Sequence, residues 1–323
     1  MQVHLVTGGA GFLGANLVRR LLERGDQVVC VDNLVTGGLD RIAELLDHER
    51  FKFLRGDVTT ALPKLRKLRV THVWALAGLA SPVHYFRRPL DTAWSGAEVQ
   101  RATLEFAADH GARMLYSSTS ELYANPDVVP TPETYVGRVN PLSPRAPYDA
   151  SKLYGETLCS IFHHELGLDV RIARIFNSFG PWLPVLDGRV VPAFLGAAMR
   201  GDSIPVHGDG SQTRSFCYVD DTIAGLMALM EAPAKVFYGL PRQPPVVNIG
   251  NPDEITMLTL AEACWKVMRD DPPRLTYLTG HPDDPERRCP DITRARELLR
   301  WEPQVPVQDG LRRTADWLKN RHA

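Results

Sequence analysis

A glycine-rich turn between the first apolar segment and the first helical segment constrains the fold most strongly. The run Thr7–Gly14 places glycines at positions 8, 11 and 14, directly after the β-branched stretch at residues 3–7. Glycines at this spacing let a backbone approach a pyrophosphate closely and point a helix N-terminus at it. Such a triplet also occurs in ordinary tight turns, but its position between strand and helix favours a dinucleotide-binding βαβ unit.

Short apolar runs continue to alternate with segments of helical period. Further strands are expected at residues 28–32, 51–54, 72–77, 112–118 and 169–176, with helices between most of them, the first at residues 13–24. This alternation predicts an α/β protein with a Rossmann-type, doubly wound parallel sheet of six strands.

The sequence pattern changes after Asn177, where prolines and glycines interrupt the alternation of strand and helix segments. We therefore expect residues 1–177 to form the dinucleotide-binding domain and residues 178–323 to form mainly a smaller, interleaved lobe for the substrate. Residues 216–250 are expected to return to the first domain, since they contain a helix and then a strand at residues 246–249.

Three later helices are expected from their capping residues and periodicity. Asp220 or Asp221 can cap a helix that ends at Met230. Thr259 and Glu262 have capping-box spacing at the start of a helix that ends near Met268. A last amphipathic helix is expected after Gly310.

Charge and cysteine content exclude several classes of partner. The 37 basic and 38 acidic side chains give a net charge of −1, so we expect neither nucleic acid nor an anionic membrane as a partner. No apolar run reaches the roughly 20 residues of a membrane-spanning helix, and the N-terminus has no export signal. The five scattered cysteines form no Cys-x-x-Cys pair, which favours a reducing cytoplasm and no metal site.

An acidic residue at the end of the second predicted strand favours NAD as the cofactor. Asp32 can accept hydrogen bonds from both adenosine ribose hydroxyls and would repel the 2′-phosphate of NADP. The alternative, that Asp32 only caps a turn with Asn33, is weaker because the glycine motif stands at the proper distance. Asp57 and Val58, after the third strand, are expected at the adenine, although an Asp in a turn is common.

A second set of residues indicates chemistry at a nicotinamide. Tyr148 and Lys152 are four apart on one helical face, so the ammonium can lower the pKa of the phenol and hold a ribose. A Tyr-x-x-x-Lys match alone carries little weight. It gains weight from residues 117–121, Ser-Ser-Thr-Ser-Glu, which supply hydroxyls and a carboxylate at the end of the fifth strand. Predicted cofactor contacts are Gly8, Gly11, Phe12, Leu13, Gly14, Asp32, Asn33, Asp57, Val58, Leu76, Ala77, Ser117, Tyr148 and Lys152.

Motifs along nearly the whole chain resemble the UDP-glucuronate decarboxylases (UDP-xylose synthases), a branch of the extended short-chain dehydrogenases. The matching stretches are Ala80–Pro82 with His84 and Tyr85, Ser118–Tyr123, Gly137 with Val139–Pro141, Arg145 and Ala146 with Tyr148 and Asp149, Ala173–Asn177, Asp187–Val191, Gly210–Arg214, and Asp283–Pro285 with Arg288 and Pro290–Ile292. This set is far more specific than the glycine and Tyr-x-x-x-Lys motifs.

The resemblance implies NAD, a UDP-sugar substrate, a homodimer and particular residue roles. Tyr148 and Lys152 would be the catalytic pair, Thr119 would support the C4 hydroxyl of the sugar, and Glu121 and Arg288 would serve decarboxylation or reprotonation. The implied substrate contacts are Ser81, His84, Tyr85, Asn177, Arg189, Val191, Arg214 and Arg288, with Asn177, Arg189 and Arg214 along the diphosphate. Arginine suits a diphosphate, although a lone arginine is usually a solvated surface charge.

Three positions depart from the family pattern. Residues 95–99 read Ser-Gly-Ala-Glu-Val where the family carries Asn-x-x-Gly-Thr, Trp182 and Leu183 stand where an Arg is common, and Leu153 replaces an Arg after Lys152. These departures put the identity of the substrate in question.

The implied reaction oxidises C4 of UDP-glucuronate, loses carbon dioxide from the β-keto acid, reprotonates C5 and reduces C4 again to give UDP-xylose. A nucleotide-sugar 4-epimerase, such as a UDP-glucuronate 4-epimerase, would share the first oxidation. A 4,6-dehydratase would use Glu121 as base but normally has Asp where Ser120 stands. A non-catalytic nucleotide sensor is a further alternative, against which the intact Tyr148 and Lys152 argue.

Overall fold

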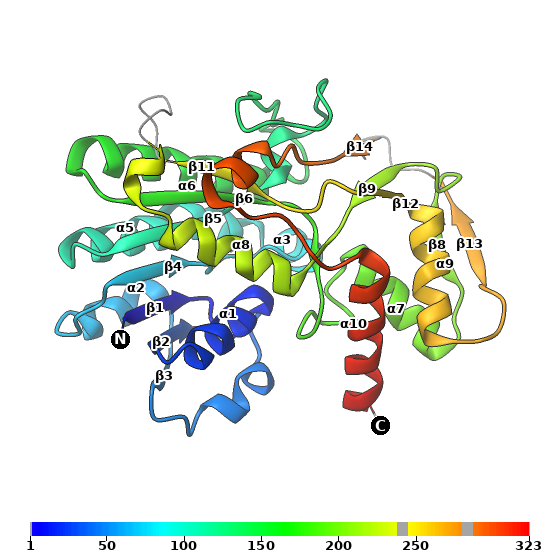
Figure 1. The fold of residues 1–323 in the computed structure, drawn as a ribbon, viewed down its shortest axis with the longest axis horizontal. Helices are drawn as coiled ribbons and strands as arrows, with labels where there is room; N and C mark the ends of the chain where they lie inside the picture. The colour runs from blue at the N-terminus through cyan, green and yellow to red at the C-terminus, as the bar shows by residue number, and fades with distance from the viewer. Residues whose placement is uncertain (1, 238–244, 280–286, 323) are drawn as a thin grey trace.

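The computed structural model describes residues 2–237, 245–279 and 287–322. It contains a large parallel sheet with helices on both faces, and a smaller group of short strands and helices beside it (Figure 1). No helix in the described ranges is both long and apolar enough to span a bilayer.

The sheet is of the Rossmann type, which confirms the predicted fold class. Its strand order is β11-β6-β5-β4-β1-β2-β3, and every neighbouring pair is parallel. The strands are β1 Val3–Thr7, β2 Gln27–Asp32, β3 Phe51–Arg55, β4 His72–Ala75, β5 Arg113–Thr119, β6 Val170–Ile175 and β11 Val246–Ile249. Within the described residues the sheet has seven strands where six were expected, because β11 adds to the edge at β6.

Alternate residues of the strands enter two hydrophobic clusters, one on each face. Leu5 belongs to the cluster that includes α2 (Val58–Ala61), α5 (Gln100–Asp109) and α6 (Ala146–Leu166). Val6, its neighbour in β1, belongs to the cluster that includes α1 (Phe12–Glu23) and α8 (Val219–Glu231). This is the period-two alternation of a strand that is buried on both faces, which only a parallel sheet covered by helices provides.

The remaining elements near the strand ends are short. They are α3 Pro82–Arg87, α4 Pro89–Trp94, a π-helical turn at Ser95–Val99 and a 3₁₀ turn at Ser120–Tyr123.

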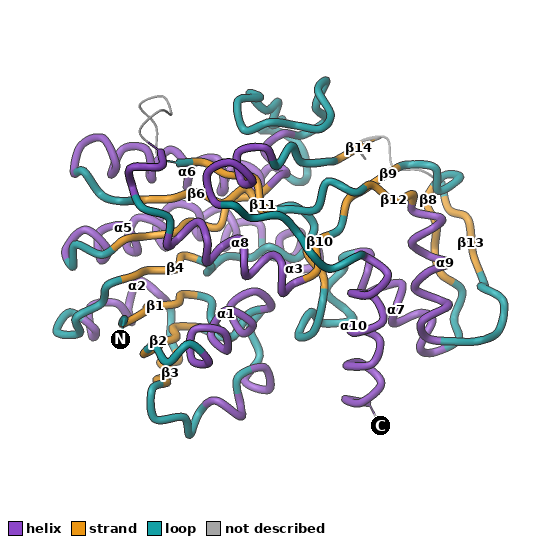
Figure 2. The backbone as a smooth tube through the Cα atoms, viewed as in Figure 1, coloured by secondary structure: helices purple, strands orange, loops and turns teal. Residues whose placement is uncertain are grey.

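The smaller lobe is assembled from segments that are distant in sequence. It contains α7 Val190–Arg200, β8 Ile204–His207, β9 Thr213–Ser215, β12 Glu254–Thr256, α9 Met257–Met268, β13 Leu275–Leu278, β14 Arg287–Arg288 and α10 Val307–His322. Its strands have two to four residues each, whereas those of the large sheet have four to seven (Figure 2). The boundary between residues 177 and 178 stays a prediction.

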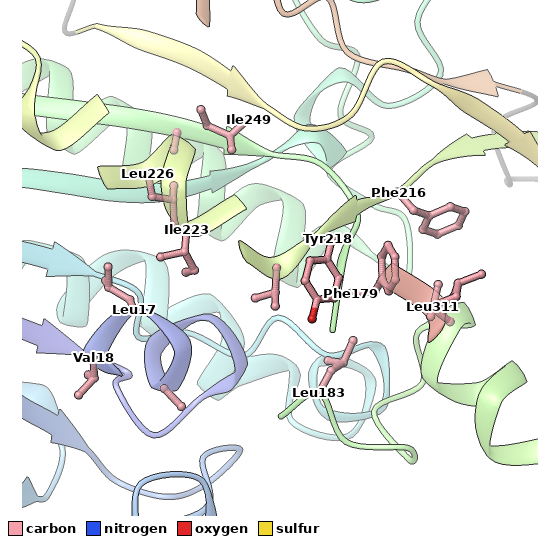
Figure 3. Packing of buried hydrophobic residues seen from close by; sticks show 14 of the residues in the cluster. Leu17, Val18, Phe179, Leu183, Phe216, Tyr218, Ile223, Leu226, Ile249 and Leu311 are labelled. Carbon is pink, nitrogen blue, oxygen red and sulfur yellow. The ribbon is translucent and has the colours of Figure 1, made fainter. Parts of the chain in front are cut away.

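A two-stranded ladder of β7 (Ser178–Phe179) and β10 (Cys217–Tyr218) lies between the sheet and α10. Phe179 and Tyr218 meet edge to face at 5.8 Å, between Ile223 of α8 and Leu311 of α10 (Figure 3). Gly310 lies against both rings, since a Cβ there would come within 2.8 Å of each. The two groups of elements therefore share one hydrophobic core.

Three predicted helix starts are wrong by a few residues. α8 begins at Val219 after the N-cap Tyr218, so Asp220 and Asp221 lie in the first turn and do not cap it. The Asp221 carboxylate instead accepts a hydrogen bond from the Val305 N–H at 2.8 Å. α9 is capped by Thr256, whose hydroxyl accepts from the Thr259 N–H at 3.1 Å, so the start predicted from Thr259 and Glu262 is too late.

The last helix, α10, begins at Val307, before Gly310. Gly310 therefore lies inside the helix, where its missing side chain makes room for Phe179 and Tyr218.

A glycine contact fixes the helix that carries Tyr148 and Lys152. A Cβ at Gly96 would lie 2.2 Å from the Ser151 carbonyl oxygen of α6, and this oxygen belongs to the backbone, which yields little. Gly96 is part of the segment that departs from the family motif. We infer that the segment serves the close packing of the π-helical turn against α6.

Gly96→Ala should therefore destabilise the protein by about 1–3 kcal/mol, although alanine is the better helix former. Gly56→Ala is the matched control, since a Cβ at Gly56 meets only the Ala61 Cβ, at 3.9 Å. The free energies of unfolding from urea titrations test this. An unchanged or higher stability for Gly96→Ala would contradict the packing argument.

Candidate active site

A cleft of about 530 Å³ opens between the carboxyl ends of the sheet strands and the smaller lobe. Parallel sheets of this type bind ligands at that edge. The cleft is lined by the glycine turn, by Tyr148 and Lys152, and by residues of β8, β9 and β14. It is large enough to hold a nucleotide-sized ligand.

The glycine turn has the geometry of a pyrophosphate cradle. Gly8 has φ +73°, and a Cβ on it would lie 2.8 Å from the Ala77 amide nitrogen. A Cβ on Gly14 would lie 2.2 Å from the Gly8 carbonyl oxygen. Among the described residues no side chain caps α1 at Gly11, so its first-turn N–H groups face the cleft without a competing side chain. The turn therefore fits the diphosphate of a dinucleotide.

Asp32 is held beside this turn at the end of β2. Its carboxylate accepts hydrogen bonds from the Ala10 N–H at 3.0 Å and the Leu34 N–H at 2.8 Å. Burial raises the pKa of Asp32, and these two N–H bonds oppose the rise. The side chain of Asn33 accepts from the Val35 N–H at 3.1 Å and so shapes the same loop.

Two residues near Asp32 line the cleft and were not predicted: Thr36 and Arg41. Burial lowers the pKa of Arg41, while Asp40, Asp187 and Asp32 oppose the change. An arginine near the end of β2 can bind the 2′-phosphate of NADP, whereas Asp32 would repel it. The relative affinity for NAD and NADP therefore tests which of the two residues dominates. No motif pointed to it, since a lone arginine in a loop is usually a surface charge.

The two predicted adenine contacts, Asp57 and Val58, lie away from the cleft wall. Asp57 caps α2, accepting hydrogen bonds from the Thr59 N–H at 2.9 Å and the Thr59 hydroxyl at 2.7 Å. Val58 is buried in the core below. Neither lines the cleft, whereas Leu76 does and Ala77 packs against Gly8. The adenine contact of Asp57 and Val58 stays a prediction.

Tyr148 and Lys152 lie on α6 and face the ends of β5. The Tyr148 ring stacks on Tyr85 with centroids 5.3 Å apart, and its hydroxyl shares a hydrogen bond with Thr119. The Lys152 ammonium donates to the Ser117 carbonyl oxygen at 2.6 Å. Burial raises the pKa of Tyr148 to about 12 and lowers that of Lys152 to about 8.

Glu121 is held between two arginines from different parts of the chain. One oxygen accepts a hydrogen bond from Arg145, just before α6, and the other accepts from Arg288 of β14. All three side chains line the cleft, and Arg288 is 7% exposed. Ionised groups survive at this depth only when they are paired. Arg145 was quoted in the family motif but was not assigned to the site.

Most of the other predicted substrate contacts also line the cleft. These are Ser81, Tyr85, Asn177, Arg189, Val191 and Arg214. Arg189 pairs with Asp187 at 2.9 Å and donates to the Ala80 carbonyl at 3.0 Å. His84 is on α3 and is not among the residues that line the cleft. Asp283, Asp284 and Pro285 lie outside the described residues.

Comparison with known proteins agrees with this geometry. Residues 4–250 match the NAD dependent epimerase/dehydratase family. The chain belongs to that family. It is an enzyme that uses NAD, and the glycine turn fits that cofactor. Asp32 is not among the residues that line the cleft, so its contact with the adenosine ribose stays a prediction.

A relative and two solved structures describe the similarity further. UDP-glucuronic acid decarboxylase 6 of Arabidopsis thaliana is 42% identical over 95% of this chain and 86% of its own. UDP-glucose 4-epimerase of Thermotoga maritima, solved with UDP-glucose, has TM-score 0.87, 28% identity and full coverage of both chains. UDP-glucuronic acid 4-epimerase of Bacillus cereus, solved with UDP-glucuronic acid and NAD, has TM-score 0.86 and 26% identity over 99% of this chain and 100% of its own.

Asp32 predicts that NAD binds at least about tenfold more tightly than NADP, because a 2′-phosphate would meet like-charge repulsion. Asp32→Ala should bring the dissociation constants of NAD and NADP closer together. Asp40→Ala is the control, since Asp40 is exposed in the same loop and pairs with Arg321. Calorimetric titration of each protein with both cofactors measures the ratio. Equal or tighter binding of NADP to the unaltered protein would mean that Arg41 outweighs Asp32.

Proposed function

We propose that this protein decarboxylates UDP-glucuronate to UDP-xylose, using NAD that is regenerated within each turnover. The observation that carries the proposal is Glu121 held by Arg145 and Arg288 beside Tyr148. A sugar that bears a carboxylate on C5 needs positive charge next to the group that oxidises C4, and this cluster supplies it.

Sequence similarity supports a decarboxylase over the alternatives. Relatives named UDP-glucuronic acid decarboxylase are 39–42% identical to this chain, whereas the solved epimerases and dehydratases are 26–29% identical. A 4-epimerase or 4,6-dehydratase activity is accordingly less favoured. A non-catalytic sensor would have no need for a buried Tyr148 and Lys152 pair.

NAD would be held by the glycine turn, by Asp32 at the adenosine ribose and by Lys152 at the nicotinamide ribose. When bound, NAD would supply the acceptor for a hydride from C4 of the sugar and, once reduced, the donor that returns it, and its nicotinamide would add positive charge to the site. Tyr148 has a pKa of about 12 without that charge, because it is buried. The hydrogen bond from Thr119 and the positive charge of Arg189 both lower the pKa of the phenol and so favour its ionised form.

In the first step, the Tyr148 oxygen accepts the proton of the C4 hydroxyl. The hydroxyl of Thr119 positions the C4 hydroxyl by a hydrogen bond. The product is a C4 ketone, which is β to the C6 carboxylate. The bond between C5 and C6 then breaks and carbon dioxide leaves. The electron pair of that bond stays on the sugar, which becomes an enolate. A proton is added to C5, and Tyr148 returns its proton as C4 is reduced.

Glu121 and Arg288 are proposed to act between these two redox steps. Arg288 pairs with one Glu121 oxygen and is proposed to turn to the substrate carboxylate. Glu121 would then support the water or proton that reaches C5. Asn177, Arg189 and Arg214 are proposed along the nucleotide diphosphate, as each contributes to the cleft wall.

The lobe boundaries, the oligomeric state and the compartment complete the proposal. We propose a Rossmann domain of residues 1–177 with the return of 216–250, and a sugar-nucleotide lobe of mainly 178–323. A homodimer is supported by large exposed apolar side chains on α3, α4 and α6, namely Phe86, Leu90, Trp94, Leu153, Tyr154 and Ile161. A cytoplasmic location is supported by the free thiols of all five cysteines.

The function predicts that the purified protein with NAD converts UDP-glucuronate into a nucleotide sugar lighter by one carbon dioxide. Mass spectrometry of the nucleotide sugars measures this, with UDP-galacturonate and UDP-glucose as separate substrates, and proton NMR of the product reports the configuration at C4. An unchanged mass with inversion at C4 would identify an epimerase. Loss of water would identify a dehydratase, and either result would overturn the proposal.

Arg288→Lys should lower kcat/KM on UDP-glucuronate by at least about tenfold, or about 2 kcal/mol, because an ammonium cannot replace a two-pronged guanidinium contact. Arg287→Lys is the matched control, since Arg287 is exposed and pairs with Glu254. NAD affinity should be the same in both variants. Wild-type kinetics for Arg288→Lys would show that β14 only supports the fold.

A further inference from the structure

Four side chains from three distant segments form a stack outside the cleft wall. The guanidinium carbon of Arg19, on α1, lies 4.2 Å from the centroid of the Trp182 ring. That of Arg321, on α10, the last helix in Figure 1, lies 4.8 Å from the same ring. Trp182 also meets Trp317 of α10 edge to face, with centroids 5.3 Å apart. We call these four residues the arginine–tryptophan stack; the mechanism above does not use them.

The backbone at Trp182 indicates that the stack is more than a surface contact. Trp182 follows β7 and has φ +72°, in the left-handed region that a bulky residue rarely adopts. Such a conformation persists only where the surroundings hold it. Asn16 of α1 donates a hydrogen bond to the preceding Pro181 carbonyl at 3.1 Å, which fixes the loop against α1. Trp182 stands where the family commonly carries an Arg, and it gives both arginines of the stack an aromatic face.

Both arginines of the stack also bind one loop of the dinucleotide-binding part, residues 36–44. Arg19 donates to the Arg41 carbonyl oxygen at 2.5 Å and pairs with Glu44. Arg321 pairs with Asp40. The stack therefore connects α10 to this loop directly through Arg321 and indirectly through Trp182 and Arg19.

The same loop rests on the glycine turn. The Gly38 N–H donates to the Ala10 carbonyl oxygen at 3.0 Å, and the Arg41 guanidinium donates to that oxygen at 3.3 Å. Thr36 and Arg41 line the cleft beside the glycines that fit a pyrophosphate. Movement of residues 36–44 away from Ala10 would thus open the wall of the cofactor site.

We propose that the arginine–tryptophan stack is a clasp that holds residues 36–44 against the glycine turn and so slows the release of NAD. An exposed ion pair such as Asp40 with Arg321 is weak alone, but here the loop can leave only if its contacts with both arginines break. Loops of this kind open locally, and the contacts that oppose the opening set how often a ligand escapes. The inference depends on NAD binding and holds whichever sugar reaction follows.

The test measures the rate constant of NAD release from the full-length protein. Protein loaded with radiolabelled NAD is mixed with an excess of unlabelled NAD, and the label that stays bound is followed with time. Trp182→Ala and Arg321→Ala should each raise the rate constant about threefold to thirtyfold, the range expected for losing a cation–π contact. Asp40→Ala, which removes the partner of Arg321, should speed the release of NAD and NADP alike and keep the ratio of their affinities.

Arg313→Ala is the matched control. Arg313 is on the same helix, lies 5.6 Å from the centroid of the Tyr218 ring and pairs with Asp220 at 3.8 Å. It therefore joins α10 to α8 by the same two kinds of contact, away from residues 36–44. Its removal should leave NAD release within about twofold of the unaltered protein, even where it lowers Tm as much as Arg321→Ala does.

Hydrogen exchange gives a second measurement that needs no release of cofactor. In protein saturated with NAD, the amides of residues 38–42, among them the Gly38 N–H bonded to Ala10, should exchange faster in Arg321→Ala than in Arg313→Ala. If Trp182→Ala does not fold, Arg321→Ala and this exchange decide the question, since Arg321 is at the surface.

Faster release in the stack variants, with an unchanged rate in Arg313→Ala, supports the clasp. A rate like that of the unaltered protein in either folded stack variant would overturn it. An equal rise in Arg313→Ala would also overturn it, because the effect would then come from the docking of α10 as a whole. None of these outcomes bears on whether the sugar is decarboxylated.

Discussion

Glu121 is the residue through which the two parts of the molecule meet at the site. It follows β5, its N–H is held by the Thr119 hydroxyl at 3.2 Å, and it receives Arg288 from β14 of the smaller lobe. β14 in turn pairs in parallel with β9, where Arg288 stands opposite Arg214. One buried ion pair therefore aligns the end of the sheet with the strands that carry the proposed nucleotide contacts. Its charges are compatible with burial only because both Glu121 oxygens are paired.

Close packing of α6 against the sheet fixes the positions of Tyr148 and Lys152. Lys152 reaches the Ser117 carbonyl at the end of β5, and a Cβ at Gly155 would lie 2.1 Å from the Tyr116 hydroxyl. Gly96 makes a similarly close approach from the π-helical turn on the other side. A helix held at this distance from both sides leaves Tyr148 little freedom. The arrangement is a preorganised acid and base, with the polar cluster of Glu121 directly above the strand ends.

Sequence patterns predicted the sheet well and the helix starts less well. The strands appeared as β-branched runs because a parallel sheet buries both faces. The strand expected at residues 246–249 was not counted among the six of the sheet, but it is β11 at the sheet edge. Asp220 and Thr259 misled the prediction because acidic and hydroxyl residues also occur inside first turns. The N-cap positions are held by Tyr218, which makes no side-chain capping bond, and by Thr256, which does. Gly310 was read as a boundary, yet it lies inside α10 under two aromatic rings.

The site residues that sequence reasoning left out share one property: their role depends on contacts between distant segments. Arg145 belonged to a recognised motif, but only the fold shows it pairing with Glu121. Arg41 is an ordinary residue type in a loop, and only the fold shows that it lines the cleft. Periodicity and spacing cannot report a side chain's burial next to a residue far along the chain.

The central claim is that one NAD oxidises and then reduces the same sugar while carbon dioxide leaves between the two steps. UDP-glucuronate carrying deuterium at C4 tests it most directly, by mass spectrometry and NMR of the product in ordinary water. The account predicts a UDP-pentose that retains deuterium at C4, with no build-up of NADH. A decarboxylated product without deuterium at C4, or a deuterated product that still holds its carboxylate, would contradict it.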